Sequence, residues 1–354
     1  MWFNSYLSNC LQYVELNGCK SACLPLMTGV PQGSILGPLL FLLYINDLPS
    51  VANLKCVTFA DDTNLLIKGD NLENIADELN RELVQISDYF KANQLKLNPT
   101  KTKAVIFRRK SLPQNHEQIR IVLDGIPLVI CNDAPFLGIT IDGTLSWEKH
   151  CTNVANKVSR NNSMLNRVKN ILPPPTLKVL YHSFIQPHIM YGLPAWGGCC
   201  AQSSKRIVSI QKRAIRTITK SYFSAHTEPR MKKLGLLKFN DLYEQQCLTL
   251  THDCFYGRAP INIRNLFEQN NSEHNLRGHT QNPLNLKIPN YKTRAASNSY
   301  SYKGSVSWNN TSLDLRKIEQ KPHFKRSIKK SILNRYDHKS DCNNPRCKDR
   351  IHHS

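Results

Sequence analysis

A long amphipathic segment lies over residues 71–92, where apolar residues recur at helical spacing and charged residues stand between them. Asp70 and Glu73 resemble a capping pair at its start. The pattern predicts a helix from Asn71 to Ala92 that covers one face of a sheet. The apolar positions are Leu72, Ile75, Leu79, Leu83, Ile86 and Phe90.

Short runs of β-branched, aromatic and aliphatic residues predict strands on both sides of this helix. Before it, residues 57–59 and 65–67 flank a polar turn. Near the N-terminus, Asn17-Gly18 separates two short runs, which is a strong signal for a tight hairpin. Strands combined with a packed helix predict an α+β fold. Further runs occur at residues 104–107, 119–123, 128–130 and 138–141.

From Leu145 onward the apolar spacing becomes helical. One long stripe ends at the prolines of residues 173–175. A later helix, from about Ser204, is expected to place four apolar residues on one side and three basic residues, spaced four apart, on the other. The apolar residues are Ile207, Ile210, Ala214 and Ile218, and the basic row is Lys212, Arg216 and Lys220.

Two other segments have a distinct composition. The most apolar run, Ile35 to Ile45, is about half the length of a membrane span and contains a glycine and a proline. It predicts a buried core helix from Pro38 to about Asn46. By contrast, residues 270–312 are rich in Asn, Ser, His and Lys, which predicts a loop-rich region before a last basic helix from about Phe324.

Composition adds a charge and a compartment to this picture. The 354 residues include 47 Lys and Arg against 26 Asp and Glu, for a net charge of +21. Such a surplus is typical of proteins that bind a phosphate backbone, although a basic row on a helix can also be a solvated face. The 12 cysteines are scattered and the N-terminus lacks a signal peptide. A reducing compartment, nucleus or cytoplasm, is therefore expected rather than secretion.

The clearest chemical signal is Phe59-Ala60-Asp61-Asp62, where two adjacent aspartates interrupt an apolar run. The flanking strands place them at or beside a hairpin turn. Two like charges this close are costly unless a cation neutralises them, and a divalent metal is the usual one. The alternative is an ordinary acidic turn, since Asp is common in turns.

Four motifs in a fixed order decide between these alternatives. The sequence resembles the palm of a reverse transcriptase, in particular that of non-LTR retrotransposons of the jockey type, and the likeness continues at lower specificity through the rest of the chain. The first two motifs are specific and the last two are weak alone. They are the Pro31-Gln32-Gly33 loop, the Phe59-Ala60-Asp61-Asp62 hairpin, Leu97-Asn98-Pro99-Thr100-Lys101-Thr102-Lys103 and Phe136-Leu137-Gly138.

The resemblance implies Mg²⁺-dependent nucleotidyl transfer that copies an RNA template onto a DNA primer from deoxynucleoside triphosphates. It makes Asp61 a metal ligand and Asp62 the supporting acid. The residues implied in substrate binding are Gln32, Gly33, Phe59 and Ala60. Lys101 aligns with a lysine placed to protonate or neutralise pyrophosphate, and its alternative is an exposed lysine in a turn. The row Lys212, Arg216 and Lys220 is expected to contact nucleic-acid phosphates.

The sequence also departs from the family. The family supplies a further aspartate upstream of the Pro-Gln-Gly loop, whereas this chain has no aspartate before Asp47. The fingers and the first palm strand are expected to be missing, so the chain is expected to be inactive or weakly active by itself. A non-catalytic RNA- or DNA-binding remnant of a retrotransposon is the rival interpretation.

The predicted organisation has three parts. Residues 1–142 form a partial palm with an antiparallel sheet, residues 143–225 a helical thumb-like module, and residues 226–354 a basic, partly loop-rich region. At its end, Cys342, Cys347 and the pair His352-His353 contain zinc-ligand residue types, but their spacing matches no common structural site, so a frayed tail is the alternative.

Overall fold

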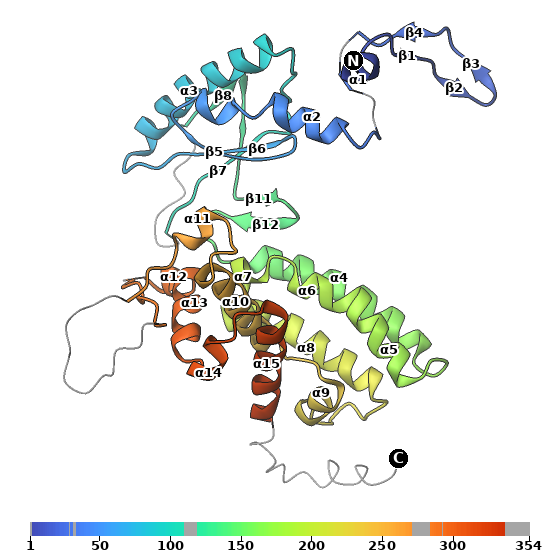
Figure 1. Ribbon diagram of the computed structural model, residues 1–354, viewed down its shortest axis with the longest axis vertical. Helices are drawn as coiled ribbons and strands as arrows, with labels where there is room; N and C mark the ends of the chain where they lie inside the picture. The colour runs from blue at the N-terminus through green and yellow to red at the C-terminus, as the bar shows by residue number, and fades with distance from the viewer. Residues whose placement is uncertain are drawn as a thin grey trace. The chain divides into compact units, whose positions relative to one another are not determined.

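The computed structural model describes residues 2–27, 29–30, 33–109, 119–270, 284–291 and 293–336. The chain divides into two compact units, which are coloured along the chain in Figure 1. Unit 1 comprises residues 1–106 and 111–131, and unit 2 comprises residues 107–110 and 132–354. The first unit mixes short strands with helices, whereas the second is mainly helical. This division agrees with the predicted α+β fold.

Unit 1 begins with a short helix and two nested strand pairs. Asn17 and Gly18 form the turn of the inner hairpin, as predicted, and both have positive φ, of 52° and 80°. The elements are α1 (Trp2–Leu7), β1 (Leu11–Gln12), β2 (Glu15–Leu16), β3 (Cys19–Lys20) and β4 (Leu24–Pro25), with β2 paired to β3 and β1 paired to β4.

The predicted apolar helix is present as α2 (Gly37–Tyr44), followed by the 3₁₀ turn η1 (Leu48–Ser50). The prediction that this helix is buried is wrong. Phe41 packs against the core residues Ile45 and Phe90, but Leu39 is 52% exposed and Leu43 is 66% exposed. The helix is apolar all round, and the described part of unit 1 covers only one of its sides.

The long helix α3 (Leu72–Ala92) packs on the hairpin of β5 (Lys55–Phe59) and β6 (Asp62–Leu66), as predicted. Ile86 and Phe90 share a core with Cys56 and Leu65 of the two strands. The helix is capped one residue later than the predicted Asp70–Glu73 pair. The Asn71 side chain accepts hydrogen bonds from the Glu73 and Asn74 backbone N–H groups, and Asn71 has the extended backbone that is typical of a cap.

The remaining strands form two-stranded pairs. In unit 1, Leu83 of α3 packs against Ile121 and Leu123. The pair of β7 and β10 is parallel, whereas the other pairs among the described residues are antiparallel. The bounds are β7 (Lys103–Val105), β8 (Val122–Leu123), β9 (Ile126–Pro127), β10 (Val129–Cys131), β11 (Asp133–Phe136) and β12 (Ile139–Asp142), the last two lying in unit 2.

Unit 2 is a helical assembly around one large core. Trp196 and Trp308, both fully buried, belong to this core together with the predicted apolar stripe of α8. A π-helical turn, η2, precedes Pro187, whose missing N–H group cannot continue the regular helical ladder. The first helices are α4 (Glu148–Val168), α5 (Pro174–Leu180), η2 (Tyr181–Ile185), α6 (Gln186–Met190), α7 (Leu193–Trp196) and α8 (Ala201–Ile218).

The C-terminal helices complete the same core, and Phe324 and Ile332 are buried in it. The loop-rich interpretation of residues 270–312 is therefore wrong for α13, whose small and aromatic residues pack against α10. These helices are α9 (Glu228–Leu234), α10 (Phe239–Phe255), α11 (Ile261–Arg264), α12 (Arg294–Ser297), α13 (Tyr300–Asn309), α14 (Leu313–Arg316) and α15 (Lys321–Asn334).

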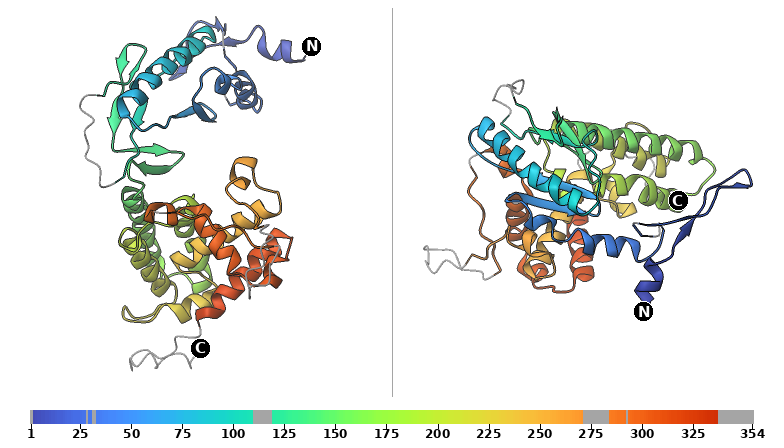
Figure 2. Two further views of the ribbon diagram at one scale, coloured as in Figure 1. Left: turned by 90° about the vertical axis from the view of Figure 1, so that its left-hand side faces the viewer. Right: turned by 90° about the horizontal axis from the view of Figure 1, so that it is seen from above.

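The two compact units do not test the predicted organisation into residues 1–142, 143–225 and 226–354, which stays a prediction. The β11–β12 hairpin belongs to unit 2, where Ile139 packs against the helical core. Residues of α8 and α15 share that core. The views in Figure 2 show the helices of unit 2 gathered around one another.

Candidate active site and nucleic-acid interface

The β5–β6 hairpin places the two aspartates at its tip, as predicted. Phe59 pairs with Asp62, so Ala60 and Asp61 are the two residues of the turn. Ala60 has a φ of 51°, in the left-handed region that tight two-residue hairpin turns require. Because Asp61 lies in the turn and Asp62 starts the strand, the alternation of strand side chains does not force the two carboxylates apart.

Both carboxylates are exposed, and neither has a hydrogen-bond or ion-pair partner among the described residues. Water screens much of their mutual repulsion at such a tip. Carboxylate oxygens are the hard ligands that Mg²⁺ and similar ions prefer, so the donor set fits a divalent metal in kind. In number it is small, because no group of three or more His, Cys, Asp or Glu suited to a metal occurs in the described part of the chain.

The other predicted active-site residues belong to unit 1, and all but one of them are among the described residues. Gln32 lies outside the described residues, so its placement beside Asp61 stays a prediction. Gly33 is described and has a φ of 79°, a conformation that glycine adopts without strain. Lys101 is exposed in a turn after α3, and its backbone N–H donates to the Asn98 carbonyl oxygen at 3.2 Å. Its predicted role is neither supported nor contradicted by these contacts.

Only two of the three residues in the predicted basic row lie on α8. Lys212 and Arg216 lie on the helix, but the helix ends at Ile218 and Lys220 follows it with a φ of 49°. Arg216 and Lys220 line a groove together with Arg213 of α8, whereas Lys212 does not line it. The predicted row was wrong at Lys220 because α8 ends at Ile218, before helical spacing reaches that residue.

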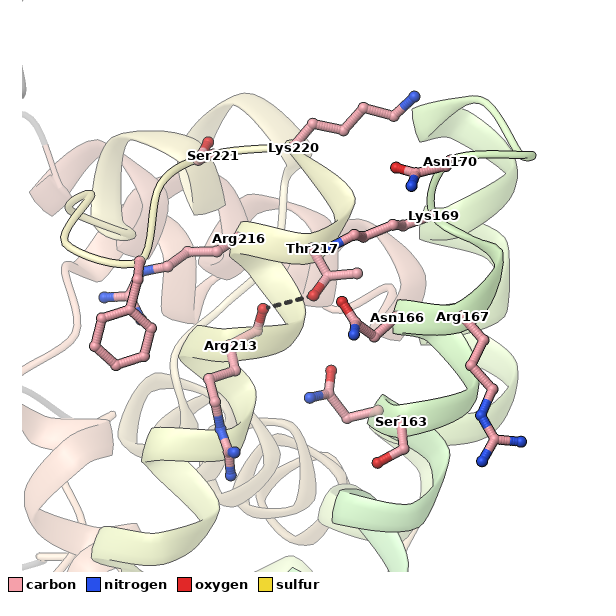
Figure 3. Close-up of a pocket in the computed structure, with 12 residues that line it drawn as sticks. Ser163, Asn166, Arg167, Lys169, Asn170, Arg213, Arg216, Thr217, Lys220 and Ser221 are labelled. Carbon is pink, nitrogen blue, oxygen red and sulfur yellow. Dashed lines mark hydrogen bonds between the residues drawn. The ribbon is translucent and has the colours of Figure 1, made fainter.

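The groove lies between α4 and α8 and has a volume of about 670 Å³. Figure 3 shows residues of α4 on one side and residues of α8 with the following loop on the other. All the charged residues that line it are basic. The lining residues are Asn162, Ser163, Asn166, Arg167, Lys169, Asn170, Arg213, Arg216, Thr217, Lys220, Ser221 and Phe223.

Arg216 is held in place within this groove. Its Nε donates a hydrogen bond to the Ala225 carbonyl oxygen at 2.9 Å, and its guanidinium carbon lies 5.6 Å from the centre of the Phe223 ring. Burial lowers the pKa of this guanidinium, and the nearby charge of Arg230 lowers it further. An anion in the groove would offset both effects.

Sequence reasoning missed the α4 side of the groove. Asn162, Asn166 and Asn170 are four residues apart, which is a helical spacing visible in the sequence, and Arg167 and Lys169 lie among them. Attention to polar periodicity, rather than to charge alone, would have singled out this face. The C-terminal Cys342, Cys347, His352 and His353 lie outside the described residues. Among the described helices, none has the length and apolar character of a membrane span.

Unit 1 and the first residues of unit 2 are similar to a known protein family. Residues 1–141 match the family model described as reverse transcriptase (RNA-dependent DNA polymerase). This confirms the family resemblance that the four motifs predicted. It also implies a divalent metal.

Individual relatives extend the similarity beyond residue 141. The chain is 27% identical over 251 residues to "RNA-directed DNA polymerase from mobile element jockey" of Drosophila melanogaster, covering 67% of the chain and 27% of that relative. It is 30% identical over 226 residues to "Probable RNA-directed DNA polymerase from transposon BS" of the same organism, covering 61% of the chain and 25% of the relative. The chain therefore spans about a quarter of the length of the curated relatives that it matches.

Proposed function

We propose that this chain, whose residues 1–141 match the reverse transcriptase family, acts in RNA-directed DNA synthesis by a mobile element. The observation that carries the proposal is the position of Asp61 and Asp62 at the tip of a two-residue hairpin, inside the matched segment. The two carboxylates at the tip have no hydrogen-bond or ion-pair partner within the described ranges, which suits the binding of a cation and of the phosphates that accompany it.

In this proposal Asp61 and Asp62 hold Mg²⁺, which when bound neutralises charge on the attacking and leaving oxygens. Gly33 lets the backbone approach the incoming nucleotide closely, and Gln32 belongs to the same nucleotide-binding loop. Phe59 and Ala60 shape the hairpin beside that nucleotide, and Phe59 is 63% exposed there. Lys101 supplies a positive charge for the pyrophosphate.

The proposed partners are an RNA template, a DNA primer and deoxynucleoside triphosphates. The net charge of +21 supports this assignment, because a polyanion would neutralise it. The cysteines of the described residues are free thiols, which suits the proposed nuclear or cytoplasmic compartment.

Primer extension tests the proposal. The chain is assayed alone and joined behind the preceding segment of the jockey relative, with Mg²⁺, primer, RNA template and nucleotides. We expect extension by the joined protein, and Asp61→Asn should reduce it by about 100-fold or more, since preorganised charge stabilisation is lost. Asp70→Asn, which removes a carboxylate from an exposed position just before α3, is the matched control and should leave the rate unchanged. Equal rates for Asp61→Asn and the unaltered protein would overturn the assignment.

A second function follows from the small number of carboxylates at the hairpin. If Asp61 and Asp62 hold the ion weakly, the chain is a nucleic-acid-binding remnant without catalysis. The same assay decides this point, because a remnant would bind the template–primer in a gel-shift experiment yet extend no primer, even when joined to the jockey segment.

A further inference from the structure

The groove between α4 and α8 combines positive charge, amide groups and an exposed aromatic ring. We propose that it binds single-stranded nucleic acid, with phosphates on the basic residues and one base stacked on Phe223. The inference deepens the proposed function and relies on it for the choice of a polynucleotide as the ligand.

The positive charges of the groove have no acidic partner in the part of the chain that the structure describes. Elsewhere in unit 2, some cations are paired with acids, as in Lys238 with Glu228 at 3.2 Å and Lys321 with Asp253 at 2.6 Å. No carboxylate lines the groove, and no ion pair joins its cations to an acid among the described residues. These cations repel one another, and a bound polyanion would relieve that repulsion. They are Arg167, Lys169, Arg213, Arg216 and Lys220.

Arg216 is prepared to bind a phosphate. Its Nε already donates to the Ala225 carbonyl oxygen, which fixes the plane of the guanidinium and leaves its two terminal nitrogens as a donor pair. A fixed guanidinium binds a phosphate with two parallel hydrogen bonds and loses less entropy than a mobile one. The volume of about 670 Å³ lies in the range of roughly 300–1,000 Å³ that small-ligand pockets occupy, so a nucleotide fits.

The exposure of Phe223 indicates that the ligand is a single strand rather than a duplex. Its side chain is 83% exposed, and its neighbour Tyr222 is 68% exposed. An exposed aromatic ring backed by a guanidinium is a platform for an unpaired base, whereas the bases of a duplex already stack on one another.

The asparagines of α4 add donors and acceptors. Asn162 and Asn166 line the groove, and the Asn162 side-chain oxygen is buried without a hydrogen-bond partner among the described residues. A base amino group or a ribose hydroxyl would satisfy this oxygen. The simpler explanation, that basic residues at helix C-termini stabilise the helix dipole, accounts for Arg167 and Arg216 but not for Phe223 or Asn162.

The test measures binding of a fluorescein-labelled oligouridylate of about 12 nucleotides by fluorescence anisotropy, using the whole chain in EDTA at several salt concentrations. The double variant Arg213→Gln with Lys220→Gln should bind roughly tenfold more weakly or worse, and the slope of log K against log salt should fall by about 1.4. The matched control, Lys205→Gln with Arg206→Gln, removes the same charge from exposed positions of α8 outside the groove. It should change the affinity by less than about twofold. Equal losses in both double variants would overturn the site.

Phe223→Ala tests the stacked base. It should weaken binding of the single strand by about 5- to 150-fold and leave binding of a duplex of equal length unchanged, because one stacking contact is lost. Phe223→Trp should restore the affinity. Because Phe223 is exposed, neither substitution should disturb the fold, and circular dichroism spectra of both variants check that they are folded. An unchanged affinity for Phe223→Ala, or equally tight binding of the duplex, would overturn the single-strand assignment.

Asp61→Asn separates this inference from the proposed function. That variant should bind the oligouridylate as the unaltered chain does, because the hairpin belongs to unit 1 and the groove to unit 2. If the Arg213→Gln, Lys220→Gln double variant extends primers and binds the oligouridylate normally, the result counts against the groove alone. Groove-dependent binding with no extension by any form would count against the polymerase function alone.

Discussion

Ala60 has the most unusual backbone in the candidate active site. Its φ of 51° is uncommon for a residue with a side chain, and it directly precedes Asp61. A left-handed conformation costs an L-residue about 1–2 kcal/mol, and such strain persists where the surrounding structure holds it. Here the pairing of Phe59 with Asp62 closes the turn and holds Ala60 in place.

The strain at Ala60 gives a prediction at the residue scale. Ala60→Val should destabilise the hairpin locally by about 1–2 kcal/mol because a β-branched side chain resists this backbone, and Ala60→Gly should not. Hydrogen exchange measured by mass spectrometry over residues 55–66 reports the difference as faster exchange in the valine variant. Ala22→Val, at another exposed position of unit 1, is the control. Equal exchange in the valine and glycine variants would contradict a strained turn.

At the scale of elements, Asp142 organises the connection from β12 to α4. Its carboxylate accepts hydrogen bonds from the backbone N–H groups of Thr144, Ser146 and Trp147 at 3.1, 3.0 and 2.8 Å. Leu145 and Trp147 both have positive φ in this turn, of 52° and 62°. The carboxylate therefore holds a strained turn in the position from which α4 begins.

Replacing Asp142 should destabilise unit 2. Asp142→Ala should lower the stability by about 1.5–3 kcal/mol, since hydrogen bonds to a charged group are lost. The control is Asp133→Ala, which removes an exposed ion pair with Lys149 of 3.2 Å and should cost less than about 1 kcal/mol. Thermal unfolding monitored by circular dichroism compares the two.

The pH dependence of the Asp142 effect has a definite sign. Burial alone would raise the pKa of this carboxyl, but hydrogen bonds from Thr144, Ser146 and Trp147 outweigh it and lower the pKa. The stabilisation is therefore complete above the unfolded pKa of about 3.9 and is lost as the pH falls through the lower folded value. The difference between Asp142→Ala and the unaltered chain should shrink in strong acid, and a constant difference would contradict this explanation.

At the scale of the whole molecule, two buried histidines make unit 2 sensitive to mild acid. Burial lowers the pKa of His150 and His252. The Nδ1 atom of His150 accepts a hydrogen bond from the Thr140 N–H group at 3.2 Å, which requires that nitrogen to be unprotonated. The unfolded chain binds protons at these positions more readily than the folded chain.

Stability should therefore fall as the pH decreases below about 6.5, the unfolded histidine value, and should be retained above it. We expect a lower melting temperature at pH 5.5 than at pH 7.5. His150→Gln, which keeps an acceptor for Thr140, should reduce that difference. A melting temperature that is unchanged or higher at pH 5.5 would contradict the buried-histidine argument.

Local features of the molecule followed from the sequence by itself. The turn at Ala60-Asp61, the helix over residues 72–92 and the apolar stripe of α8 depend on neighbours within a few positions, so periodicity and turn residues suffice to predict them. The family resemblance also followed from short motifs read in order. The error at Lys220 is of the same local kind, because periodicity does not state where a helix ends.

The tertiary structure decided which faces meet. Asn162 and Phe223 are about 60 residues apart, and only the packing of α4 against α8 places both in one groove. The same packing placed Arg213 rather than Lys212 in the groove, and the packing of α13 and α15 on α10 brought both helices into the core with α8. The sequence pattern did not predict the exposure of Leu43 on α2 for the same reason. Burial depends on the surfaces that distant segments present to one another, and spacing along the chain carries no record of that arrangement.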